Sequence, residues 1–138
     1  MDVRTMRRED LDPVARVFVA AYEEGWTAEQ AKSYLEKFYG FEPDSCLVAT
    51  EQGAIVGAIL GYSYPRQREI ILFIQELFVH PEARSRGFGR KLVGALRGRF
   101  SENPKVNVKP LVKAPPSVHS FYNSLGFDRE KAFTFYDG

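Results

Sequence analysis

The chain has 138 residues, of which 44% are hydrophobic and 27% are charged, and its formal net charge at pH 7 is +1, a composition that excludes disordered and collagen-like chains. Its one cysteine, Cys46, cannot close an internal disulfide, so we expect a reducing compartment and not a disulfide-stabilised secreted scaffold. The charged amino terminus lacks an apolar signal segment and no apolar run reaches the roughly 20 residues that span a bilayer, so we expect one cytoplasmic domain over residues 1–138.

The first elements expected along the chain are a short strand and two helices. Residues 3–6 are typical of a strand. Residues 10–24 repeat apolar side chains at steps of three and four, which predicts a helix. Thr27, followed three residues later by Gln30, forms a capping box that opens a second helix, and Gly40 ends it.

The hydrophobic pattern then changes to that of strands. Residues 45–51 and 54–62 are rich in β-forming side chains and are joined by Gln52-Gly53, which indicates a tight hairpin. A turn at residues 65–69 leads to a long strand over residues 70–79. That strand begins with an unbroken apolar run, as expected for a central strand covered on both faces.

The last part of the chain alternates helices and strands. We expect a helix over residues 90–101, a strand over 106–112, a short helix over 115–125 and a final strand over 133–136. Together these elements predict an α/β fold, with a mixed sheet and helices on both of its faces.

The near-neutral net charge conceals a basic block at residues 80–113, which hold nine Lys or Arg and two Asp or Glu. Such a block inside a near-neutral protein suggests a local site for a polyanion. A solvated basic helix face is the simpler alternative.

A glycine-containing loop lies inside this basic block. Gly87 and Gly89 follow the long strand and precede a helix, so backbone amides of the loop and of the first helical turn can converge on phosphate oxygens. Arg84, Arg86, Arg90 and Lys91 add positive charge there. Neither the P-loop pattern nor the dinucleotide-binding glycine pattern matches this spacing.

Two segments identify the resemblance that this chain carries. Residues 84–89 (RSRGFG) resemble motif A of the GNAT superfamily of N-acetyltransferases, Gln/Arg-x-x-Gly-x-Gly/Ala. Residues 121–127 (FYNSLGF) resemble the second hallmark of that family, aromatic-Tyr-x-x-Leu-Gly-Phe, at the right distance downstream. The hairpin with Gly57 matches the strands that usually precede motif A. The resemblance covers residues 45–127 well, and residues 1–44 only in the order of elements.

The resemblance implies one GNAT domain whose mixed, mostly antiparallel sheet is splayed at its central strands. It implies an acyltransferase that moves acetyl from acetyl-CoA directly to a primary amine, with acetyl-CoA as co-substrate and no metal. The pyrophosphate would rest on the loop amides and the pantetheine arm on the central strand. By this resemblance the coenzyme-binding residues are Leu77, Phe78, Val79, Arg84, Ser85, Arg86, Gly87, Phe88, Gly89 and Arg90.

Two further residues match catalytic positions of the family. Glu76 stands just before the pantetheine-binding residues, where many members carry a general base, although an exposed or salt-bridged strand carboxylate is the alternative. Tyr122 matches the tyrosine that protonates the departing thiolate, although it lies on the apolar face of its helix and is compatible with plain core. One position departs from the pattern, because Pro115 stands where many members carry a coenzyme-binding asparagine; Ser117 or Asn123 are candidates to replace it.

The sequence leaves several functions open. The first hypothesis is acetylation of a small amine such as an aminoglycoside, a polyamine or an amino-acid derivative; the second is acetylation of protein amino termini or lysines. A coenzyme-A-binding sensor without turnover is a third, and nucleic-acid binding through residues 80–113 is a fourth that we do not favour. We expect no membrane partner, and we leave a homodimer open. His80 and His119 lack metal-ligand spacing.

Overall fold

The fold is built on one five-stranded sheet with the strand order β1-β2-β3-β4-β5. The computed structural model of the chain describes residues 1–103, 105–112, 116–129 and 136–138. Neighbouring strands are antiparallel except β4 and β5, which are parallel, so the sheet is mixed as expected. The strands are β1 (Asp2–Thr5), β2 (Cys46–Glu51), β3 (Ala54–Arg66), β4 (Glu69–Val79) and β5 (Val106–Pro110).

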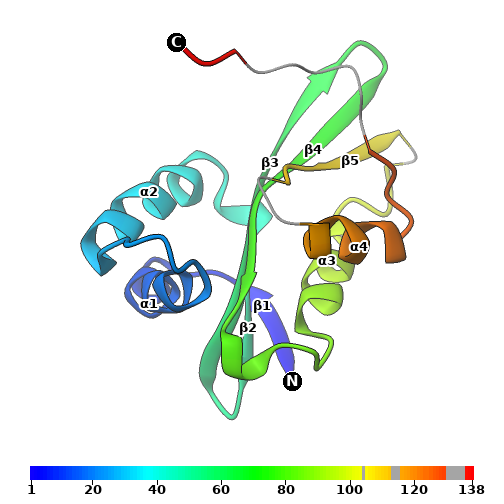
Figure 1. Cartoon of the computed structure of the whole chain (residues 1–138). Coiled ribbons are helices and arrows are strands. Elements are labelled where there is room, and N and C mark those ends of the chain that lie inside the picture. The colour runs from blue at the N-terminus through cyan, green and yellow to red at the C-terminus, as the bar shows by residue number, and fades with distance from the viewer. Residues whose placement is uncertain (104, 113–115, 130–135) are drawn as a thin grey trace.

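Helices cover both faces of this sheet (Figure 1). On one face α1 (Leu11–Ala21) and α2 (Ala28–Phe41) pack over a core that includes Leu60 and Phe78. On the other face α3 (Phe88–Gly98) and α4 (Pro116–Ser124) lie over a second core. Short 3-10 turns, η1 (Arg8–Asp10), η2 (Pro43–Ser45) and η3 (Pro81–Ala83), connect the larger elements. The predicted α/β class is therefore confirmed.

Local sequence signals explain where two of the helices begin. The predicted capping box at α2 is present, because the Gln30 amide donates to Thr27 Oγ1 at 3.1 Å and the Thr27 amide donates to Gln30 Oε1 at 3.0 Å. Helix α3 begins at Phe88, two residues before the predicted start, because Gly87 adopts a φ of +84° as its N-cap residue.

The hairpin of β3 and β4 is longer than the sequence predicts. Residues 63–66, which include part of the predicted turn, continue β3, and the chain reverses at residues 67–68. Pro65 is tolerated in this strand because β2 pairs with β3 only as far as Leu60, which leaves the outer part of β3 at an edge of the sheet. The hairpin projects beyond the other strands in Figure 1.

The remaining differences concern the two ends of the chain. Helix α1 ends at Ala21, three residues before the predicted end. The strand predicted at residues 133–136 falls outside the described residues except for Tyr136, which is exposed and in no strand. Across the described segments, no helix combines the length and apolar character needed to cross a membrane.

Candidate active site

A β-bulge at Gln75 in the central strand β4 sets the direction of the Glu76 side chain. One extra residue of β4 stands opposite the step from Leu60 to Gly61 in β3. A bulge re-aims the side chains that follow it, so two successive residues can share one face of the sheet. Gln75 and Glu76 both hydrogen-bond to Tyr34 of α2, which places both side chains on the face covered by α1 and α2.

The Glu76 carboxylate is buried and accepts hydrogen bonds from two phenols. Only 5% of the residue is exposed. Tyr22, directly after α1, donates its hydroxyl to Oε1 at 2.9 Å, and Tyr34 donates to Oε2 at 2.5 Å. Gln75 Nε2 in turn donates to the Tyr34 oxygen at 3.2 Å. Glu76 is therefore a buried carboxylate whose position is fixed by hydrogen bonds. It is not the exposed strand residue that was one alternative.

Tyr122 of α4 is also buried, and it lies close enough to Glu76 for the carboxylate charge to affect its pKa. Its ring packs on Phe121 and Phe127, with ring centroids 5.1 and 5.8 Å away. Burial raises the pKa of Tyr122 well above its usual value, and the negative charge of Glu76 raises it further. Tyr122 thus stays protonated at neutral pH, which is the form of a phenol that can donate a proton.

The sheet opens beside these residues because β5 leaves β4. The parallel pairing of the two strands ends where Ile74 faces Pro110, and the Leu111 amide then donates to the Ile74 carbonyl oxygen at 2.9 Å. Residues 76–79 pair with β3 and, in the part of the chain that is described, with no strand on their other side. This is the splayed sheet that the family resemblance implies, and it leaves main-chain groups of β4 next to Glu76 at an open edge.

The loop from η3 to α3 has the backbone geometry of an anion site. Ser85 and Gly87 have φ values of +64° and +84°, which turns neighbouring amides toward a common side. The first main-chain bond of α3 runs from the Lys91 amide to the Gly87 carbonyl oxygen at 3.0 Å. The amides of Phe88, Gly89 and Arg90 precede that bond, so they are the donors of a helix amino terminus.

The basic side chains of this loop are less concentrated on one spot than the sequence suggests. Arg86 forms a two-pronged ion pair with Glu51 of β2, at 2.8 and 3.0 Å. Arg84 donates to the Ala21 carbonyl oxygen at 3.1 Å, which ties the loop to the end of α1. Arg90 reaches Ser124 Oγ in α4 at 3.4 Å. These groups fix the loop to its neighbours as well as adding positive charge.

The packing of α4 on α3 also requires a glycine at position 89, which the motif alone does not indicate. A Cβ atom built there would lie 3.2 Å from the Phe121 ring. The glycine therefore lets α4 approach α3, and it keeps Phe121 and its neighbour Tyr122 where they are. Sequence reasoning assigned this glycine to access for a phosphate alone.

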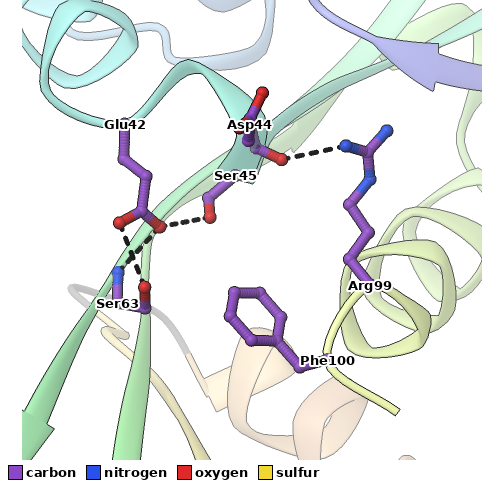
Figure 2. A pocket seen from close by; sticks show the side chains of 6 residues that line it. All are labelled: Glu42, Asp44, Ser45, Ser63, Arg99 and Phe100. Atoms are coloured by element: carbon purple, nitrogen blue, oxygen red, sulfur yellow. Dashed lines mark hydrogen bonds between the residues drawn. The ribbon is translucent and has the colours of Figure 1, made fainter. Parts of the chain in front are cut away.

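One cavity lies near the ends of α2 and α3, and another lies at the connection between α1 and α2. Figure 2 shows the larger one, of about 500 Å³. There Glu42 accepts hydrogen bonds from the Ser63 amide at 2.9 Å and from the hydroxyls of Ser63 and Ser45. The smaller one, of about 400 Å³, lies at the α1–α2 connection; it is lined by Glu24, Gly25, Trp26 and Gln30. Neither cavity is lined by Glu76, Tyr122 or the residues of the loop.

The structure places the open edge of β4 beside Glu76, and it places Tyr122 close enough to Glu76 for the carboxylate charge to raise the pKa of Tyr122. The side chains of Leu77 and Val79 pack toward α3, whereas Phe78 is buried toward α1, so the contacts expected from these three residues are limited to their backbone. Pro115 lies outside the described residues.

Sequence reasoning missed Tyr22, Tyr34 and Gln75. In the sequence, Tyr22 belongs to the apolar face of the first predicted helix, and Tyr34 belongs to an aromatic cluster that is compatible with core packing or, by the family resemblance, with a wall of the acceptor cleft. The one available signal was that a buried tyrosine hydroxyl needs a polar partner.

Comparisons with known proteins agree with this fold. The chain is 31% identical to an uncharacterized N-acetyltransferase of Archaeoglobus fulgidus over 141 residues, which cover 96% of each chain. The aminoglycoside N-acetyltransferase AAC(6')-Iy in complex with CoA shares the fold with a TM-score of 0.76 and 18% identity, over 99% of this chain and 93% of that one. A ribosomal-protein-alanine N-acetyltransferase from Brucella melitensis superposes with a TM-score of 0.73 and 16% identity, over 99% and 98% of the two chains.

A family model assigns the chain directly. Residues 42–129, which contain β2 to β5, the loop from η3 to α3, and α4, match the acetyltransferase (GNAT) domain. The resemblance predicted from residues 84–89 and 121–127 is therefore confirmed, and the chain belongs to the GNAT family of acetyltransferases.

Proposed function

We propose that this acetyltransferase uses acetyl-CoA to acetylate a primary amine on a small cationic molecule. The observation that carries the proposal is the buried group of Glu76 and Tyr122 next to the open edge of β4. A carboxylate that can accept a proton and a phenol that holds one are the two groups that transfer from a thioester to an ammonium requires.

The residues around the site fit a coenzyme with a diphosphate and an amide-containing arm. The amides at the start of α3 and the positive φ of Ser85 and Gly87 suit the diphosphate. The main chain of Leu77, Phe78 and Val79 suits the arm, because this edge of β4 carries no neighbouring strand among the described residues. When bound, acetyl-CoA supplies an activated thioester.

A small cationic acceptor is favoured by the cavity at the α1–α2 connection. Glu24 lines that cavity and adds negative charge to it. Trp26, also in its wall, lies with its ring centroid 5.3 Å from that of Tyr34, which hydrogen-bonds to Glu76. A molecule with a second positive charge would thus meet the Glu24 carboxylate and the Trp26 ring, and Tyr34 lies between that ring and Glu76.

The roles of the two residues follow from the chemistry of the groups. An alkyl ammonium has a pKa near 10.4, so Glu76 is proposed to accept its proton before the amine attacks. Tyr122 is proposed to donate a proton to the sulfur as negative charge develops there. A main-chain amide of residues 77–79 is proposed to polarise the thioester carbonyl.

An acetyl-transfer screen tests the proposal. The panel contains kanamycin, spermidine, lysine and a tetrapeptide with a free amino terminus, and product is detected by mass. We expect transfer to kanamycin or spermidine, and transfer to the peptide alone would instead favour a protein acceptor. Acetyl-CoA binding without product on any amine would favour a sensor.

Two variants test the assigned roles. Tyr122→Phe should lower turnover on the order of 10²-fold while acetyl-CoA affinity stays nearly the same, because it removes only a hydroxyl. Glu76→Gln should flatten the acidic limb of the rate–pH profile. Tyr64→Phe is the matched control, since this partly exposed tyrosine in the outer part of β3 lies away from the site. Unchanged turnover in Tyr122→Phe would assign that residue to the core.

A further inference from the structure

The proposed base is buried and lies behind two phenols. Glu76 is only 5% exposed, and each of its carboxylate oxygens already accepts a hydrogen bond from a phenol. Each phenol therefore offers a hydrogen-bonded path along which a proton can reach this carboxylate, in addition to the acceptor positions that the two oxygens keep.

The two phenols are held differently. The Tyr34 oxygen donates to Glu76 and also accepts from Gln75 Nε2 at 3.2 Å, and its ring packs between Trp26 and Phe38, with centroids 5.3 and 5.2 Å away. These contacts fix the Tyr34 hydroxyl from both sides.

Tyr22 has a simpler environment. Its hydroxyl donates to Glu76 Oε1 at 2.9 Å and, within the described residues, accepts no hydrogen bond. Burial raises the pKa of Tyr22, and Glu76, Tyr122 and Tyr34 are close enough to raise it further. Tyr22 is thus the phenol whose oxygen can still accept a proton, whereas the Tyr34 oxygen already accepts from Gln75.

We propose that the proton of the acceptor ammonium reaches Glu76 through the hydroxyl of Tyr22, while Tyr34 and Gln75 position the carboxylate. The inference rests on the proposed function. In this arrangement Tyr22 is a catalytic residue that contacts the substrate nitrogen, and Tyr34 is a positioning residue.

The step is balanced in protons. The ammonium N–H bond breaks as its proton moves to the Tyr22 oxygen, and the Tyr22 O–H bond breaks as its own proton moves to Glu76 Oε1. The phenol is restored, the amine is neutral and the carboxylate becomes a carboxylic acid, which later returns its proton to water. No oxidant or additional reactant is needed.

The surroundings of Glu76 set the pH range in which this relay is visible. Tyr22 and Tyr34 from the α1–α2 side and Tyr122 from α4 are among the titratable groups that interact with it, and Arg84 is fixed on the carbonyl of Ala21, the residue before Tyr22. Burial raises the pKa of Tyr22 far above its ordinary value, so its hydroxyl keeps its proton in the alkaline range. An acceptor amine, in contrast, loses its proton to solvent as the pH approaches about 10.

The test compares the pH profiles of kcat/KM for Tyr22→Phe and Tyr34→Phe, with the fastest-acetylated amine of the panel above as the probe. Tyr22→Phe should lose on the order of 10²-fold at pH 7, and this deficit should shrink toward pH 10 because the amine is then neutral without a relay. Tyr34→Phe should show a deficit that does not depend on pH. Tyr64→Phe should follow the parent protein throughout, and calorimetry with acetyl-CoA should give the same affinity for all four proteins.

The possible outcomes separate the two ideas. A deficit in Tyr22→Phe that is absent, or that stays constant with pH, would overturn the relay while leaving the acetyltransferase proposal intact. A deficit that shrinks with pH only in Tyr34→Phe would also overturn it, by assigning the relay to the other phenol. A parent protein that acetylates no amine of the panel would overturn both proposals.

Discussion

Replacement of Gly61 by alanine tests whether the close approach of β3 and β4 at the bulge is needed. A Cβ atom at Gly61 would lie 2.7 Å from the carbonyl oxygen of Phe73 and 3.4 Å from Leu96 Cδ2. Ordinary contact begins near 3.4 Å, so about 0.7 Å of movement is required. The Phe73 carbonyl cannot move freely, because at this residue β4 is paired with β3 and also with β5. We therefore expect a loss of about 2 kcal/mol in the free energy of unfolding.

The assay is reversible urea unfolding, with thermal melting as a second measure. A loss of about 2 kcal/mol corresponds to a fall in Tm of about 8 °C for a domain of this size. Gly94→Ala is the matched control, because a Cβ atom there meets nothing within 4 Å on an exposed position of α3. It should raise stability by about 0.8 kcal/mol through helix propensity. Turnover should fall in Gly61→Ala, since the bulge that directs Glu76 adjoins this residue. A Gly61→Ala protein as stable as the Gly94→Ala protein would refute this reasoning.

Three further predictions concern other parts of the molecule. Asp10 is buried and accepts hydrogen bonds from Arg4 at 2.7 and 3.0 Å, so Asp10→Asn should lower the free energy of unfolding by about 2 kcal/mol at neutral pH. Because the hydrogen bond from Arg4 lowers the pKa of Asp10, urea unfolding should show this difference in full above about pH 4, and the difference should disappear as the pH falls through the lowered pKa. A difference between the two proteins that grows in acid would contradict the assignment. Gly89→Val should displace Phe121 and lower turnover more than acetyl-CoA affinity, which kinetics and calorimetry together would measure; an affinity that falls more than turnover would favour phosphate access as the reason for this glycine. Burial raises the pKa of Cys46 to about 12, so a thiol reagent at pH 8 should react at the rate of unfolding, and immediate reaction in native buffer would be incompatible with this environment.

The parts of the fold that the sequence predicts are those that depend on near neighbours. The capping box of Thr27 and Gln30 involves residues three apart, whereas the start of α3 was predicted two residues late because it depends on the backbone conformation of Gly87. The extended end of β3 was wrongly assigned to a turn because Pro65 usually interrupts a strand. It is accepted there because β2 ends earlier, which is a property of the sheet and not of the segment.

The details of the candidate site depend on residues that are distant in the chain. The hydroxyls that hold Glu76 come from positions 54 and 42 residues away, and helix periodicity registers Tyr22 and Tyr34 only as parts of apolar faces. The ion pair of Arg86 with Glu51 similarly spans 35 residues. Motifs predict which residues gather at a site, but the partner of each polar group is set by the packing of helices on the sheet.

The projecting hairpin carries a consequence for self-association. An uncovered strand border normally invites a strand of another molecule to add to it, since its amides still need acceptors. At the border of β3 beyond β2, the amide of Ser63 is taken by the carboxylate of Glu42, and Pro65 has no amide to offer. The hairpin can therefore extend into solvent without becoming a template for aggregation.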